Sequence, residues 1–142
     1  MTGAKAIVDE INSYIRKNCI DEFELKSYDG RQLSIVGSTD LIYYHKIEIL
    51  FTEAFFVSAY FQRWYSNIDN SIIELLDEDE RKMANIPFEI ESGYELFMMK
   101  SADFENEMIV AAKTIHFNTD IVYFYRRHNL GFNERLADFL ED

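Results

Sequence analysis

Hydrophobic residues recur every three or four positions near the N-terminus, which predicts an amphipathic helix over residues 4–19. Thr2 precedes this segment and is a suitable N-cap. The stripe should pack against a sheet, with Cys19 buried at its end as an inert thiol. The stripe consists of Ala4, Ile7, Val8, Ile11, Tyr14, Ile15 and Cys19.

Apolar and polar residues alternate on both sides of Asp29-Gly30, which predicts a β-hairpin over residues 22–38. A loop over residues 28–30, with Gly30 left-handed, pairs Leu25 with Leu33 and keeps the apolar faces together. A shift by one residue would mix those faces, so we expect this register.

A second alternating stretch starts at Tyr43 and continues to Phe51. As a regular strand it places His45 on the more apolar face and Glu48 on the opposite face. A loop over residues 52–54 would then return the chain as a second hairpin and pair His45 with Phe61. The sequence therefore predicts an aromatic corner around His45.

The segment from residue 66 to residue 87 is more acidic than its neighbours. Its apolar residues between Ile68 and Leu76 predict a short helix, capped by Asp69 or Asn70. Carboxylates at the C-terminal end of a helix oppose its dipole, so this helix should fray near Asp79.

Four further strands are predicted over residues 88–91, 94–101, 108–117 and 121–126, followed by a short C-terminal helix over 132–142. That helix should turn Phe132, Leu136, Phe139 and Leu140 inward. The whole chain, residues 1–142, is predicted to be a single α+β domain. Its sheet is curved, mostly antiparallel and built from hairpins, with an N-terminal amphipathic helix, an acidic mid-chain helical segment and a short C-terminal helix.

Composition narrows the classes of partner. The 142 residues carry 26 acids against 14 bases, a net charge of −12. This charge argues against binding to nucleic acid or to an anionic membrane, because both need a basic surface. No apolar run approaches the roughly 20 residues of a membrane helix, and the one cysteine cannot form an internal disulfide. We expect a cytoplasmic protein without a signal peptide.

The motifs of common enzymes are not found. Five glycines form no phosphate-binding loop, and no serine lies in a nucleophile elbow. The three histidines, His45, His116 and His128, lack the spacing of metal ligands. We therefore expect no cofactor and no metal site, and the sequence favours a function without catalysis.

Two groups of residues are candidates for function. Exposed aromatic residues beside an acidic run would anchor and steer a basic protein partner. This leading hypothesis, a non-catalytic acidic protein-binding module such as an immunity-type inhibitor of a basic toxin or enzyme, involves Trp64, Tyr65, Asp69, Asp77, Glu78, Asp79 and Glu80.

The alternative is a small-molecule-binding or enzymatic α+β cup with a histidine in an aromatic pocket. Its candidate residues are Tyr43, His45, Phe61 and His116. His45 would serve as a proton-transfer group, although a packed, hydrogen-bonded histidine at the edge of the core accounts for the same pattern. A homodimer formed through a sheet edge is a third hypothesis.

Overall fold

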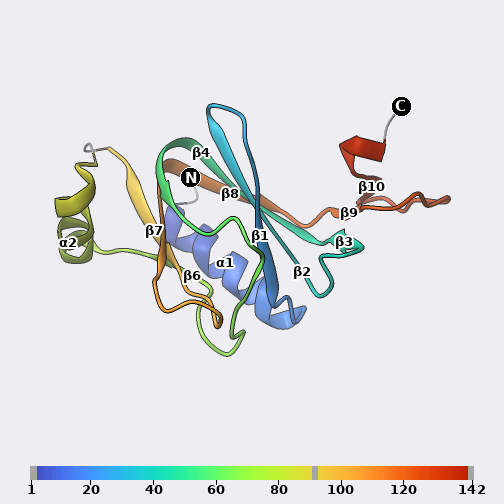
Figure 1. Cartoon of the computed structure of the whole chain (residues 1–142), viewed down its shortest axis with the longest axis horizontal. Coiled ribbons are helices and arrows are strands. Elements are labelled where there is room, and N and C mark those ends of the chain that lie inside the picture. Colours follow the sequence, from blue (N-terminus) through green and yellow to red (C-terminus); the bar gives the residue numbers. More distant parts are fainter. Residues whose placement is uncertain (1–2, 91–92, 141–142) are drawn as a thin grey trace.

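The computed structural model describes residues 3–90 and 93–140, without the side chains of 84–88. Figure 1 shows a curved sheet with the N-terminal helix α1 (Ala4–Lys17) against one face. The sheet has seven strands in the order β5-β1-β2-β4-β8-β7-β6, and each neighbouring pair is antiparallel. Their bounds are β1 (Glu22–Tyr28), β2 (Gln32–Ser38), β4 (Ile47–Ser58), β5 (Trp64–Tyr65), β6 (Ile73–Leu75), β7 (Glu95–Met99) and β8 (Met108–Asn118).

A smaller sheet lies at one end of the molecule, on the right in Figure 1. It contains β3 (Tyr44–His45), β9 (Ile121–Tyr123) and β10 (Glu134–Leu136), with β9 in the centre and β10 parallel to it. The helix α2 (Glu78–Phe88) lies at the opposite end, and a 3-10 turn, η1 (Asp138–Leu140), follows β10. The α+β class with a mostly antiparallel curved sheet is therefore confirmed.

The amphipathic N-terminal helix is confirmed, but its end differs from the prediction. Val8, Ile11 and Ile15 face the core, and the N-cap is Gly3. Thr2, the predicted N-cap, lies outside the described residues. After Asn18, Cys19 adopts a left-handed φ of 53° and the Ile20 amide donates to the Ile15 carbonyl. This Schellman-type ending turns Ile20 inward and leaves Cys19 exposed, so the prediction of a buried thiol was wrong.

The first hairpin forms with a different register. Its loop is Asp29-Gly30-Arg31, and the Asp29 carboxylate accepts hydrogen bonds from the amides of Arg31 and Gln32. These bonds hold the pKa of Asp29 below its ordinary value. Tyr28 pairs with Leu33 beside the loop, and after a bulge between Leu25 and Ser27 Leu25 pairs with Ile35 instead of Leu33. Phe23 then lies opposite Gly37.

The second predicted hairpin does not exist. β4 continues through residues 52–54, pairing with β2 as far as Thr52 and with β8 as far as Ser58. The chain bends instead at Lys46, which separates β3 in the small sheet from β4 in the large one. At this bend the Lys46 amide donates a hydrogen bond to the Gly37 carbonyl of β2.

The mid-chain and C-terminal helices were also misplaced. Residues 73–75 form β6, and α2 begins at Glu78, where the predicted helix was to fray. Asp77 and Glu80 cap α2 reciprocally, each side chain accepting from the other residue's amide. Residues 134–136 form a strand, and Phe132 and Phe139 point into solvent.

The strands predicted over 94–101, 108–117 and 121–126 are present as β7, β8 and β9. β7 is apolar on both faces because it joins two cores: Phe97 packs in the main core under α1, and Leu96 and Met98 pack in a smaller cluster on the other face. Residues 88–90 form no strand; they include the last residue of α2.

Gly37 allows close packing of the side chains where β2 lies between β1 and β4. A Cβ at this position would lie 2.8 Å from Phe23 and 2.9 Å from both Ile20 and Ile47. We predict that Gly37→Ala lowers the free energy of unfolding by about 1–3 kcal/mol, the usual cost of overpacking a core. Urea denaturation measures the change, with Thr114→Ala on the exposed side of β8 as the control. Equal stability of Gly37→Ala and the wild type would contradict the close packing.

Candidate functional site

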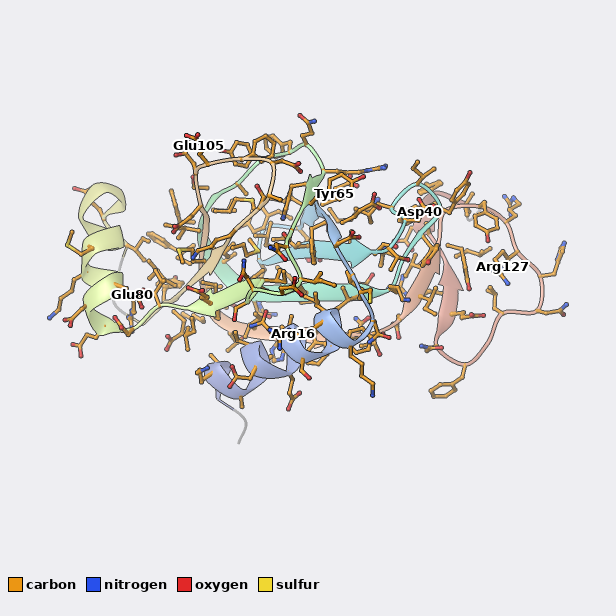
Figure 2. The ribbon with its side chains drawn as sticks, turned by 90° about the horizontal axis from the view of Figure 1, so that it is seen from below. Arg16, Asp40, Tyr65, Glu80, Glu105 and Arg127 are labelled. Atoms are coloured by element: carbon orange, nitrogen blue, oxygen red, sulfur yellow. The ribbon has the colours of Figure 1, made fainter. Side chains whose placement is uncertain are left out.

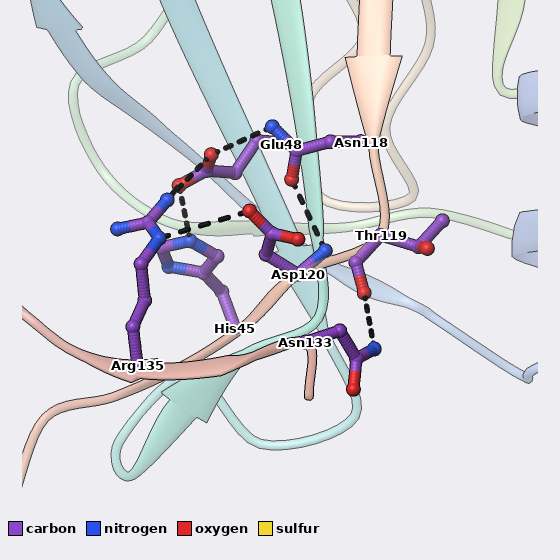
Figure 3. Close-up of polar contacts among 7 residues, drawn as sticks. All are labelled: His45, Glu48, Asn118, Thr119, Asp120, Asn133 and Arg135. Atoms are coloured by element: carbon purple, nitrogen blue, oxygen red, sulfur yellow. Dashed lines mark hydrogen bonds and ion pairs between the residues drawn. The ribbon is translucent and has the colours of Figure 1, made fainter. Parts of the chain in front are cut away.

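The densest group of polar contacts surrounds Glu48 on β4, where the two sheets meet (Figure 3). The His45 ring nitrogen Nε2 lies 2.8 Å from Glu48 Oε2, and the Asn118 amide donates to Oε1 at 3.0 Å. Arg135 Nη2 lies 2.8 Å from both oxygens, while its Nε lies 3.7 Å from Asp120 Oδ2. Four elements, β3, β4, β8 and β10, thus share one carboxylate. We call these residues the Glu48 cluster: His45, Glu48, Asn118, Asp120 and Arg135.

The contacts keep Glu48 ionised. Burial alone raises the pKa of this carboxyl, but hydrogen bonds from His45 and Asn118 and the charges of Arg135 and His45 outweigh burial and lower the pKa to about 2. An ionised carboxylate only accepts hydrogen bonds, so His45 Nε2 carries the proton that it shares with Glu48. His45 Nδ1, which is buried, has no hydrogen-bond partner among the described residues.

The prediction that Glu48 points away from His45 was wrong. It assumed a regular strand from Tyr43 to Phe51, in which residues three apart lie on opposite faces. The bend at Lys46 removes that relation and brings both side chains to the inner side of the junction.

A cavity of about 430 Å³ lies beside the Glu48 cluster, between the two sheets. The large sheet contributes one wall, and the small sheet with the C-terminal segment contributes the other. The lining residues are Lys26, Ser27, Ser34, Val36 and Glu48 on the first wall and His45, Val122, Phe124, Arg135, Ala137, Asp138 and Phe139 on the second.

Of the predicted pocket residues, only His45 lines this cavity. Tyr43 is exposed and contacts Tyr125 edge to face, and Phe61 is 86% exposed in the loop after β4. His116 is exposed on β8, opposite Leu50 of β4. The structure therefore separates the four residues, because the hairpin expected to bring His45 and Phe61 together does not form.

The two predicted aromatic anchors have opposite environments. Trp64 is 1% exposed and stacks on Phe23 in the main core, so the expected partial exposure of Trp64 was wrong. Tyr65, on the other face of β5, is 50% exposed. Its hydroxyl donates to Glu22 and its amide donates to Asp103.

The predicted acidic residues are all exposed: Asp69, Asp77, Glu78, Asp79 and Glu80. Figure 2 shows Glu80 on α2 at one end of the molecule and Tyr65 near the middle. The acids of α2 and Tyr65 therefore do not form one continuous surface.

Reasoning from the sequence missed Arg135, Asn118 and Asp120 at the cluster and Lys26 and Asp138 at the cavity. Their partners are distant in the chain, as for Arg135 and Glu48, which are 87 residues apart. No local pattern marks such pairs.

Comparison with protein-family models, curated proteins and solved structures found no match to this chain. Within residues 3–90 and 93–140, no group of three or more His, Cys, Asp or Glu side chains is arranged to hold a metal ion. Among the described helices, none has the length and apolar character needed to cross a membrane.

The low pKa of Glu48 predicts a specific dependence of stability on pH. A lowered folded-state pKa gives stabilisation that is complete above the ordinary value of 4.5 and is lost as pH falls toward about 2. The difference corresponds to about 3 kcal/mol. Glu48→Gln should lose this amount at pH 7 and show a flatter dependence between pH 5 and pH 2, measured by urea denaturation.

Glu53→Gln is the matched control, because Glu53 lies on the same strand and pairs with Arg31 at an exposed position. If the two variants have the same stability and the same pH profile, Glu48 does not hold the junction.

Proposed function

We propose that this protein is a non-catalytic protein-binding module that contacts a basic partner through the surface around Tyr65. An immunity-type inhibitor of a basic toxin or enzyme is the class of protein that this description fits best. The observation that carries the proposal is a half-exposed tyrosine surrounded by carboxylates. We call this the Tyr65 surface: Tyr65, Asp21, Glu22 and Asp103.

The carboxylates around Tyr65 disfavour its phenolate. The hydrogen bond to Glu22 and the charge of Glu22 raise the pKa of the phenol most, and Asp21 and Asp103 raise it further. Carboxylates that disfavour a phenolate favour a cation at the same place. A lysine or arginine from a partner would meet both these carboxylates and the face of the tyrosine ring.

The surroundings of Tyr65 suit a protein contact. Phe61, four residues earlier in the chain, is almost fully exposed and offers apolar area. Arg63, the cation between them in the sequence, is already paired with Glu24 at 3.1 Å. The net charge of −12 would speed the approach of a basic protein, because long-range attraction raises association rates more than it slows dissociation.

The test compares capture of basic proteins by immobilised wild type and by two variants, Tyr65→Ser and Asp21→Asn. Lysate from the source organism is applied at low salt, and bound proteins are identified by mass spectrometry. We expect one basic protein to bind in stoichiometric amount and each variant to weaken binding about tenfold or more, as for residues at the centre of an interface.

Asp79→Asn on α2 is the control, because it removes the same charge at a distance from Tyr65. A contact at the Tyr65 surface would be contradicted if the three variants all bound the partner equally weakly. It would also be contradicted if none of them bound it more weakly than the wild type.

A second candidate function is self-association through the end of the molecule that carries the small sheet. Ile42, Tyr43, Phe132 and Phe139 are all more than half exposed there. Exposed apolar side chains gathered in one region often mark a protein interface.

Light scattering after size-exclusion chromatography tests this candidate. If the end surface forms a dimer, the wild type should have twice the monomer mass, and Phe132→Ser combined with Tyr43→Ser should be monomeric. Met83→Ser, an exposed apolar position on α2, is the control. A monomeric wild type at high protein concentration would exclude the homodimer.

A further inference from the structure

The helix α1 borders an open groove on the side that faces solvent. The groove has a volume of about 630 Å³ and lies between α1 and the end of β8. Tyr14 of α1 and Phe117 of β8, which are both half-buried, give the groove an apolar floor. Figure 2 shows α1 along one border of the molecule, so this face can be approached from solvent.

Four residues of α1 form one stripe beside the groove. They are Glu10, Ser13, Tyr14 and Lys17. Their spacing of three and four positions places them on one side of the helix. The buried residues of α1 lie on another side and pack in the main core. Tyr14 also borders that core, but the rest of the stripe does not hold α1 to the sheet.

The two charges of the stripe are placed symmetrically. Neither Glu10 nor Lys17 forms an ion pair with another described residue, and both are exposed, so neither needs a partner in the monomer. The midpoint of the stripe falls between Ser13 and Tyr14. Glu10 and Lys17 lie at equal distances on either side of this midpoint, about 5 Å along the helix axis.

This stripe is complementary to itself. If α1 of a second copy lies antiparallel across the same midpoint, Glu10 of each copy faces Lys17 of the other. The small side chain of Ser13 then faces the large ring of Tyr14. Such reciprocal contacts, in which each residue of a pair meets the other twice, are those of a two-fold interface. A different protein would need the same pattern in reverse, whereas a second copy carries it already.

We propose that two copies of this chain form a two-fold dimer through antiparallel packing of their α1 helices. Tyr14 of each copy packs on Ser13 of the other, and the contact covers the apolar floor of both grooves. This inference concerns a face other than the Tyr65 surface and does not depend on the proposed basic partner. It also differs from the end-surface candidate, whose contacts include Tyr43 and Phe132.

Exchange of the two charges tests the pairing. Analytical ultracentrifugation of the full chain at low salt measures the dissociation constant of the dimer. Glu10→Lys or Lys17→Glu alone places like charges opposite each other twice in the dimer, so each variant should raise the constant about tenfold or more. The chain with both substitutions should recover the wild-type constant. An equimolar mixture of the two single variants should form heterodimers, because opposite charges then face each other in both pairs.

Glu105→Lys and Lys82→Glu are the controls, because they make the same charge changes at exposed positions away from α1. These variants should leave the constant unchanged, alone or mixed, and so should Phe132→Ser combined with Tyr43→Ser. The proposal is overturned if the wild type is monomeric at high concentration or if the mixed single variants form no heterodimer. It is also overturned if the end-surface variant is monomeric and the charge variants remain dimers.

Discussion

The carboxylate of Glu48, on the large sheet, binds side chains from both sheets of this protein. Partial burial makes a carboxylate costly unless it is paired and hydrogen-bonded, so the half-buried Glu48 depends on its partners. Those partners are His45, Asn118 and Arg135, which lie 3, 70 and 87 residues away in the chain. Because they come from three different strands, meeting the needs of one charge also fixes how the small sheet sits on the large one.

The cavity follows from this junction. β10 carries Arg135 to Glu48, and the residues after it, Ala137 to Phe139, then form the wall opposite the large sheet. The same arrangement leaves His45 Nδ1 without a protein partner, since Nε2 is directed to Glu48. The Tyr65 surface depends on a different element, β5, where pairing with β1 turns Trp64 into the core and Tyr65 outward.

Local periodicity was sufficient for the N-terminal helix, for most strands and for the α+β class, because burial on one face imposes a regular spacing. It failed at residues 52–54, where a loop was expected. These residues contain no glycine, proline or asparagine, and β4 continues through them, paired with β2 as far as Thr52 and with β8 beyond it. The bend at Lys46 has no local signal either, and it alone decides that His45 meets Glu48. Arg135 could not be predicted at all, because its role depends on which distant strands become neighbours.

Hydrogen–deuterium exchange of the wild type and of Glu48→Gln tests the central role of Glu48 most directly. If Glu48 holds the small sheet in place, the backbone amides of β9 and β10 should lose protection from exchange in the variant. The amides of β2, β4 and β8 should remain protected. Uniform loss across both sheets, or unchanged protection of β9 and β10, would show that the two sheets are joined by something other than this carboxylate.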